Sequence, residues 1–238
     1  MLYLNQSPLT KNPTLQFMNQ RVILTKVIEQ VRVNGFWFID IPRTSSSSIR
    51  AELGRIYGIP YGKANLIERE FSMGQIFEDH LPASAMMQVF GPEIWDRLFT
   101  FSLVRNPWDR VLSMYHHRRK VRGIPQAMSF RDYVIELNCR NWGVEGSIFQ
   151  YRWHYFGSAD YVCGANDEIL VDFVGHFENR TEDIDRIASR IGAPGLGDLT
   201  IQRASPSGQH YSRWYEQDTK DMIKAIYKRD IELFHYEF

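Results

Sequence analysis

The feature that most constrains this chain is the stretch of residues 36–49, where an apolar run leads into a serine-rich turn and then into helical spacing. Aromatic and β-branched residues over 36–41 predict a strand buried on both faces. Pro42 ends that strand because proline cannot donate a hydrogen bond to a sheet ladder. From Ser48 onward, apolar residues recur every three to four positions. A strand, a tight turn and a helix are therefore expected in direct succession.

This predicted turn has the chemistry of an anion site. It carries one cation, Arg43, and five hydroxyl side chains, namely Thr44, Ser45, Ser46, Ser47 and Ser48. The first N–H groups of a helix have no intrahelical partner, and the helix dipole favours negative charge beside them. A phosphate or sulfate group fits this set of donors, although a serine-rich helix cap without a ligand would look similar. The glycine and lysine of a Walker A loop are absent, which disfavours ATP and GTP.

A second stretch of the same kind follows at residues 99–115. An apolar strand is predicted over 99–104, Arg105 stands at its carboxyl end, and Pro107 suits the first turn of the next helix. Ligands bind at the carboxyl ends of strands in open α/β sheets, so Arg105 and Ser113 on that helix are candidates to hold one anion. Taken without the first motif, a surface ion pair and a plain helix serine would explain them equally well.

Length, charge and cysteine content limit the class of protein. A chain of 238 residues with 44% hydrophobic residues fits one α/β domain over 1–238, with residues 1–16 as an irregular arm. The formal net charge is zero, so no global field attracts nucleic acid. The two cysteines form neither a disulfide framework nor a metal-spaced pair. No membrane-spanning run or signal peptide is recognisable, which predicts a cytoplasmic protein, while the sequence leaves the oligomeric state open.

Further elements are expected from hydrophobic periodicity. The predicted helices span residues 17–33, 83–90, 93–98 and 216–234. Together with the two strand-turn-helix stretches, they predict alternating strands and helices and therefore a mostly parallel sheet.

The two anion-ready strand ends resemble the PAPS-dependent sulfotransferases, and more narrowly their carbohydrate sulfotransferase-like branch. Residues 40–48 are similar to that branch's motif H-I-P-K-T-A-G-T-S, and residues 105–115 match R-x-P-x-x-R-x-x-S-x-Y at every defined position. The likeness continues at residues 80–83, 171–179 and 230–238. PAPS is 3′-phosphoadenosine 5′-phosphosulfate, the sulfuryl donor of this family.

The resemblance implies a P-loop-like three-layer α/β sandwich, a mostly parallel sheet flanked by helices. It also implies transfer of a sulfuryl group from PAPS to an acceptor hydroxyl by in-line displacement. Residues 43–48 would bind the 5′-phosphosulfate, with Arg43 stabilising the leaving oxygen, and Arg105 and Ser113 would bind the 3′-phosphate. A polar loop before the last helix, with Arg203, Tyr211 and Arg213, would close over the nucleotide. No metal is expected, because a sulfuryl group carries less charge than a phosphoryl group.

Three departures from the family motif bear on activity. Arg43 replaces the family lysine, which keeps the charge but changes its shape from a point ammonium to a planar fork. Ser46 stands in place of glycine, so the loop must form without glycine's conformational freedom. Asp40 stands in place of histidine. A catalytically impaired protein that binds PAP or PAPS is therefore an alternative, and a P-loop-type kinase is a more remote one.

The general base that takes the acceptor's proton is expected between the two motifs. His80 is the first candidate because its intrinsic pKa lies near neutrality, followed by Glu78 and Asp40. A packing or capping role for His80 is the competing interpretation. His116 and His117 are lesser candidates, expected along a groove wall.

The acceptor is the least determined part of the prediction, and a glycan or glycolipid is expected from the resemblance. Seven basic residues lie between positions 97 and 122, namely Arg97, Arg105, Arg110, Arg118, Arg119, Lys120 and Arg122. They suit either an anionic glycan or a solvated helix face. An aromatic segment suits either sugar stacking or core packing; it comprises Trp142, Tyr151, Trp153, Tyr155 and Phe156.

Overall fold

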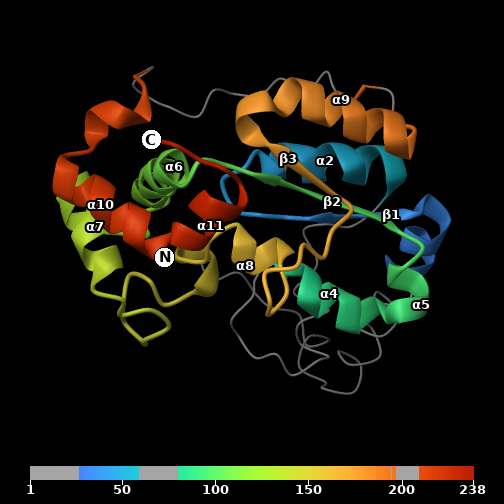
Figure 1. The fold of residues 1–238 in the computed structure, drawn as a ribbon, viewed down its shortest axis with the longest axis horizontal. Coiled ribbons are helices and arrows are strands. Elements are labelled where there is room, and N and C mark those ends of the chain that lie inside the picture. Colours follow the sequence, from blue (N-terminus) through green and yellow to red (C-terminus); the bar gives the residue numbers. More distant parts are fainter. Residues whose placement is uncertain (1–26, 59–79, 194, 197–208) are drawn as a thin grey trace, which may run out of the picture.

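The computed structural model describes residues 27–58, 80–193, 195–196 and 209–238, in which helices alternate with strands (Figure 1). The strands are β1 (Phe36–Ile39), β2 (Phe99–Val104) and β3 (Phe173–His176). The α-helices are α2 (Ser46–Tyr57), α4 (Ala83–Phe90), α5 (Pro92–Trp95), α6 (Pro107–Lys120), α7 (Phe130–Asn138), α8 (Ala159–Val162), α9 (Arg180–Ile191), α10 (Gln217–Ile226) and α11 (Lys228–Leu233). The 3-10 helices are η2 (Arg152–His154), η3 (Phe177–Asn179) and η5 (Tyr211–Trp214). Residues 27–34 are also helical.

The described strands form one parallel sheet in the order β1-β2-β3. Phe36 pairs with Phe99 across the first pair of strands, and Phe101 pairs with Phe173 across the second. Every residue of β1 is buried, as expected for a strand covered on both faces. The predicted α/β class with a parallel sheet is confirmed.

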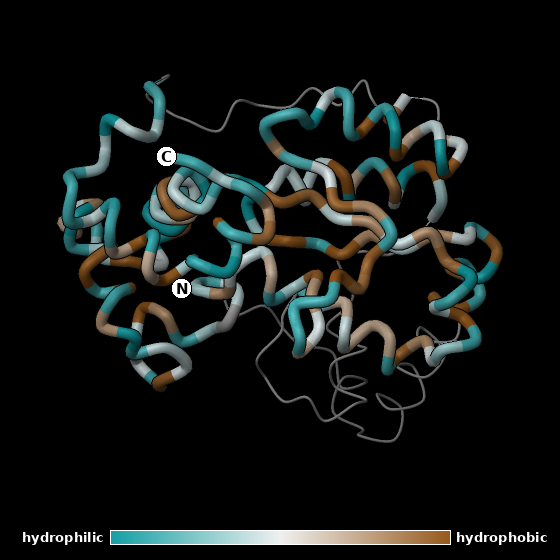
Figure 2. Tube along the Cα trace, in the orientation of Figure 1, coloured by the Kyte–Doolittle hydropathy of each residue, from teal (hydrophilic) through white to brown (hydrophobic). Residues whose placement is uncertain are grey.

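Helices cover both faces of this sheet and make three layers (Figure 1). Helices α2 and α9 lie on one face, and α4 and α8 lie on the other. The two upper helices are tied together where the Tyr57 hydroxyl donates to the Ile191 carbonyl at 2.8 Å. Hydrophobic residues predominate along β1 and β2 in the central layer (Figure 2), where all residues except Phe99 are buried.

A second group of helices packs beyond the carboxyl ends of the strands. Helices α6, α7, α10 and α11 gather there (Figure 1), around a separate hydrophobic cluster that includes Trp108, Tyr115, Tyr133 and Ile223. The Trp108 indole donates to the Lys220 carbonyl at 3.0 Å and joins α6 to α10. The site at the strand ends therefore lies between the sheet core and this helical cluster.

Several predicted boundaries were wrong. Helix α2 begins at Ser46 and not at Ser48, and β1 ends at Ile39. The helix predicted over 93–98 is the single turn α5. The helix predicted over 216–234 is broken at Tyr227, whose φ of −106° and ψ of 30° are not helical. Tyr227 is buried in the helical cluster, so packing overrides the local helical pattern there.

Some expectations fall outside the described residues. The irregular arm over residues 1–16 lies there, as does most of the helix predicted over 17–33, while residues 27–34 are helical as expected. The single-domain interpretation stays a prediction. None of the helices in the described segments combines the length and the apolar character needed to cross a bilayer.

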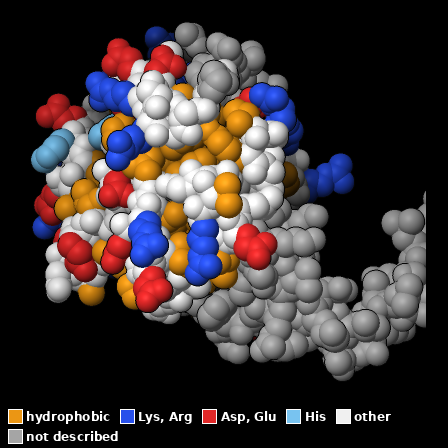
Figure 3. Space-filling model, turned by 90° about the vertical axis from the view of Figure 1, so that its right-hand side faces the viewer, with side chains coloured by type: hydrophobic (Ala, Val, Ile, Leu, Met, Phe, Trp, Pro, Cys, Tyr) orange, Lys and Arg blue, Asp and Glu red, His pale blue; other side chains and the backbone are white. Residues whose placement is uncertain are grey.

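The end of the molecule opposite the strand carboxyl ends shows a mixed surface. In its described part, positive and negative side chains are interspersed around hydrophobic surface (Figure 3). Val33, on the helical segment before β1, is 85% exposed. Interspersed charges of both signs agree with the zero net charge and produce no single-sign field on this face.

Candidate active site

The loop between β1 and α2 takes an unusual backbone path. Arg43 and Ser45 both adopt left-handed conformations, with φ of 70° and 71°. The Thr44 hydroxyl donates to the Ile41 carbonyl at 2.9 Å and closes the turn internally. The sequence suggested that the loop would need a glycine-like conformation at Ser46. Ser46 is instead the first residue of α2, and the left-handed residues are Arg43 and Ser45. The turn thereby brings the N-terminus of α2, with its unpaired N–H groups, to the strand end.

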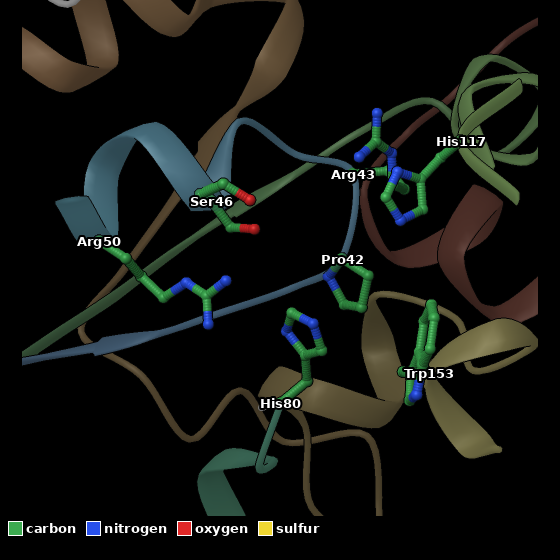
Figure 4. A pocket seen from close by; sticks show the side chains of 8 residues that line it. Pro42, Arg43, Ser46, Arg50, His80, His117 and Trp153 are labelled. Carbon is green, nitrogen blue, oxygen red and sulfur yellow. The ribbon is translucent and has the colours of Figure 1, made fainter. Parts of the chain in front are cut away.

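A pocket of about 220 Å³ opens at this point (Figure 4). Its walls come from the β1–α2 loop, α2, the segment before α4, α6 and η2. The lining residues are Pro42, Arg43, Ser46, Ser47, Arg50, His80, His117 and Trp153. The fold thus brings predicted donor-binding residues and the first-choice base to one cavity.

Arg43 is the cation that the two strand ends share. Its Nε donates to the Ser113 hydroxyl on α6 at 3.2 Å, so the first motif touches the second. Burial, and then the nearby Arg105, lower the pKa of Arg43 to about 10. The guanidinium still carries its full charge at neutral pH. A lysine in the same surroundings would titrate much closer to neutrality, because its ordinary pKa is lower.

Asp40 joins two cationic or titratable side chains behind the pocket. Its Oδ2 forms an ion pair with Arg50 Nε at 2.9 Å and lies 3.1 Å from His80 Nδ1. The same Nδ1 is 3.2 Å from the Asp40 carbonyl oxygen. Asp40 is only 6% exposed, while His80 and Arg50 face the cavity. Of the predicted bases, Glu78 lies outside the described residues.

The end of β2 is closed. Arg105 is 5% exposed, and its Nε and Nη2 both lie 2.8 Å from Asp109 Oδ2. Its Nη1 donates to the Arg43 carbonyl at 2.8 Å, and its guanidinium stacks 4.0 Å from the centre of the Phe177 ring. Burial lowers the pKa of Arg105, and Asp109 opposes that effect. Ser113 is also buried, so a 3′-phosphate would have to compete with existing partners at both predicted residues.

Arg110 has a role that the sequence did not reveal. It is 4% exposed, and its Nε donates to the Pro42 carbonyl at 3.0 Å. Its Nη1 donates to the Phe156 carbonyl at 2.8 Å. Two buried bonds from a charged donor fix the backbone of the β1–α2 loop to the wall opposite. The only sequence signal for this brace was the second arginine of the β2–α6 motif.

Arg50 and Trp153 also line the pocket, and of the two only Arg50 was not singled out from the sequence. Arg50 follows Ser46 by four residues on α2, a spacing that places both on one helix face and could have been noticed. Trp153 belonged to the aromatic segment, and its ring lies 6.3 Å from that of His80. Elsewhere in that segment, Trp142 and Tyr155 stack on each other at 4.8 Å and line a different cavity.

The predicted nucleotide-closing loop is described only in part. Arg203 lies outside the described residues. The Tyr211 hydroxyl accepts from Asn106 Nδ2 at 3.2 Å, and Asn106 caps α6 by accepting from the Trp108 N–H. Tyr211 therefore sits at the closed β2 end, and Arg213 is exposed on η5.

Three histidines near the pocket favour the neutral form. Burial lowers the pKa of His117, and Arg43 adds to that effect. Burial and Arg119 lower the pKa of His116, whose ring packs against Trp214 at 4.9 Å. Burial lowers the pKa of His154 to about 3. Of these, His117 lines the cavity, as a groove-wall residue should.

The basic stretch over 97–122 is neither a uniform glycan surface nor a solvated face, so both interpretations were wrong for part of it. Arg105, Arg110 and Arg118 are buried and donate to carbonyl groups inside the protein. Across the described segments, no three His, Cys, Asp or Glu side chains gather closely enough to hold a metal ion.

Comparisons with known proteins give one family match and two similar proteins. The model of the sulfotransferase family matches residues 32–237, a span that contains both strand-end motifs. An uncharacterized protein of Archaeoglobus fulgidus is 31% identical over 127 residues, which covers 52% of this chain and 93% of that protein. The crystal structure of a sulfotransferase from Alicyclobacillus acidocaldarius aligns with a TM-score of 0.44 and 17% identity, over 86% of this chain and 96% of that one. The assignment rests on the family match alone.

Proposed function

This chain belongs to the sulfotransferase family, and we propose that it transfers a sulfuryl group from PAPS to a hydroxyl of a carbohydrate or glycoconjugate. The observation that carries the proposal is that Arg43 and His80 line one cavity at the N-terminus of α2. A charge-stabilising donor and a base are the two groups that an in-line displacement on sulfur requires.

In this proposal the 5′-phosphosulfate binds beside the first turn of α2. The free N–H groups there and the hydroxyls of Ser46 and Ser47 supply donors to its oxygens. Arg43 donates to the bridging oxygen, where negative charge grows as the sulfur–oxygen bond breaks. The acceptor oxygen forms the new bond to sulfur, its proton passes to His80, and the nucleotide phosphate leaves with the electron pair.

The 3′-phosphate is proposed to bind at the β2 end through Arg105 and Ser113. The support is the position of both residues in the matched motif, together with Tyr211 beside the same helix start. Because Asp109 holds Arg105, phosphate binding would exchange one anionic partner of the guanidinium for another. The site needs no new cation for this exchange.

The acceptor is proposed to lie against Trp153. An aromatic wall beside the base suits the C–H face of a sugar ring, and Arg50 offers a cation on the opposite side of the pocket (Figure 4). A cytoplasmic location, with no nucleic-acid partner, stays part of the same proposal.

The test is a screen of sulfur-35-labelled PAPS against glycans, glycolipids and small alcohols, with wild type and Arg43→Ala side by side. We expect label transfer to at least one sugar-bearing acceptor by wild type and almost none by the variant. PAP binding without transfer to any acceptor would instead indicate the catalytically impaired binding protein. Magnesium-dependent turnover of ATP would indicate the kinase.

A further inference from the structure

The proton of neutral His80 can be placed from its contacts. Nδ1 lies 3.2 Å from the Asp40 carbonyl oxygen and 3.1 Å from Asp40 Oδ2. A backbone carbonyl can only accept, so Nδ1 must carry the hydrogen that points at it. In the neutral ring, Nε2 then keeps its lone pair. The nitrogen that is free of Asp40 is the basic one.

Asp40 is poorly placed to be the base itself. It is 6% exposed, and its Oδ2 already faces both Arg50 and His80. The walls of the cavity include His80 and Arg50, and among the described residues Asp40 is not part of them. Its carboxylate therefore acts on the pocket through His80 and Arg50, which both line the cavity (Figure 4) and lie within ion-pair distance of Asp40.

We propose that Asp40 is the positioning residue of a coupled Asp40–His80 pair, and that Arg50 provides the fixed counter-charge of this pair. The Asp40 backbone carbonyl holds His80 as the Nδ1–H tautomer, so that Nε2 faces the acceptor hydroxyl, and the Asp40 carboxylate lies 3.1 Å from Nδ1. As the acceptor oxygen bonds to sulfur and the nucleotide phosphate leaves, the hydroxyl proton moves to Nε2. The resulting imidazolium is then stabilised by the Asp40 carboxylate. This inference rests on the proposed function, which it deepens.

The pairing gives a physical reason for the aspartate at the first position of the motif. His80 lies 40 residues further along the chain, and the two meet because β1 ends beside the segment that leads into α4. The backbone carbonyl of residue 40 supplies the acceptor for Nδ1, and the aspartate side chain adds a negative charge 3.1 Å from that nitrogen for the imidazolium. Of the three predicted bases, two act as one unit in this arrangement.

The first test needs no acceptor and no variant of Asp40. Nitrogen-15 NMR of the histidine-labelled protein, with His80 assigned by its loss in His80→Gln, reports which ring nitrogen is protonated at alkaline pH. We expect a protonated Nδ1 and a bare Nε2. A His80 ring found as the Nε2–H tautomer would overturn the proposal, whether or not the protein transfers sulfuryl groups.

The second test is a double-mutant cycle on turnover with the acceptor found by screening. His80→Ala should lower kcat by about 10²- to 10⁴-fold. Asp40→Asn should lower it by about 10- to 100-fold, because the charge that stabilises the imidazolium is lost while the backbone carbonyl that orients Nδ1 remains. The double variant should be no slower than His80→Ala within about threefold, because Asp40 acts through His80. Multiplied effects would overturn the coupling.

A matched control separates this role from general stability. Asp172 accepts from the Thr100 N–H at 2.7 Å and from its hydroxyl at 2.8 Å, at the opposite end of the sheet. Asp172→Asn should lower the melting temperature and leave kcat unchanged. If wild type transfers nothing to any acceptor, the proposed function fails, and the NMR measurement still decides where the proton lies.

Discussion

The two strand ends of this protein share one local pattern and differ in what surrounds it. Each strand runs into an arginine and then into a helix, yet Arg43 at the β1 end faces a cavity while Arg105 at the β2 end is buried. Arg105 already has Asp109, the Arg43 carbonyl and the Phe177 ring as partners. The same strand-cation-helix pattern can thus leave its arginine at a cavity or enclose it in the protein.

The closed end supports the open one. Arg105 donates to the Arg43 carbonyl and Arg110 donates to the Pro42 carbonyl, so two buried cations of the second motif hold the backbone of the first. Each such bond from a charged donor is worth about 1.5–3 kcal/mol. These bonds help to offset the left-handed conformations at Arg43 and Ser45. The predicted binding role of Arg105 and its bracing role can be separated experimentally.

The largest effect is expected at the open end. Arg43→Ala should lower turnover about a hundred- to a thousandfold and weaken PAP binding far less, because the charge is needed where it grows in the transition state. Arg43→Lys should keep partial or full activity near neutrality and lose it at alkaline pH, where a buried lysine begins to lose its proton. Steady-state kinetics and PAP titration would measure both.

The matched control for that comparison is Arg55→Ala on α2, the helix that follows the loop of Arg43. Arg55 is exposed and pairs with Glu52, so its loss should change neither kcat nor PAP affinity. Wild-type turnover by Arg43→Ala would contradict the proposed role of the open end.

The next effect tests whether the closed end also binds ligand. Arg105→Ala should weaken PAP at least tenfold, which corresponds to the loss of one charge-assisted bond of about 1.5–3 kcal/mol. Adenosine 5′-monophosphate, which lacks the 3′-phosphate, should bind almost as it does to wild type. Calorimetric titration with the two nucleotides gives the ratio.

Arg110→Ala is the control for bracing alone. It should lower the free energy of unfolding and weaken both nucleotides equally, because it holds the loop from behind. If Arg105→Ala weakened the binding of PAP and of adenosine 5′-monophosphate equally, the β2 end would have a structural role and would not bind the 3′-phosphate.

A third prediction concerns how the free energy of unfolding depends on pH through His154, which packs behind the wall of the open pocket. His154, whose ring packs 3.9 Å from Trp153, has its pKa lowered to about 3 by burial. Below its ordinary pKa of about 6.5 the unfolded chain takes up a proton that the folded protein refuses. The contribution of neutral His154 to the free energy of unfolding is therefore fully present above pH 6.5. It is lost as the pH falls toward 3, with a slope of up to about 1.4 kcal/mol per pH unit.

Urea unfolding of wild type and His154→Gln at a series of pH values would measure this term as the difference between the two curves. The difference should change in favour of the variant on acidification. Parallel curves would show that His154 is protonated equally in the folded and unfolded chains.

The smallest effect concerns the strain in the loop. Ser45 makes no side-chain cap bond and has a φ of 71°, so Ser45→Gly relieves a left-handed residue without losing a helix cap. We expect a gain of roughly 0.5–1 kcal/mol in unfolding free energy, since the relief of about 1–2 kcal/mol is partly offset by glycine's greater chain entropy. Ala51→Gly, in the exposed body of α2, should instead lose about 1 kcal/mol. A lower free energy of unfolding for Ser45→Gly than for wild type would contradict the proposed backbone strain at Ser45.

Predictions from the sequence succeeded where the signal was local. The strand over residues 99–104 and the helix over 83–90 have the predicted bounds. An apolar run defines the strand, and Pro82 and Gly91 flank the helix. They failed at Tyr227, where a continuous helical pattern is interrupted by packing against the helical cluster. The left-handed residues of the first loop were also misplaced, because serine and arginine give no glycine-like signal there.

By itself, the sequence determined the two strand-cation-helix motifs, their order and their chemistry, since each depends on residues within a few positions of one another. Only the tertiary structure decided which cation stays open. Arg43 meets Ser113 across 70 residues because parallel pairing of β1 with β2 places their carboxyl ends side by side. Asp40 meets His80 across 40 residues because the segment that leads into α4 lies beside the end of β1. Burial then separates the two arginines: a guanidinium without enough partners must stay near water, and Arg105 has partners that Arg43 lacks.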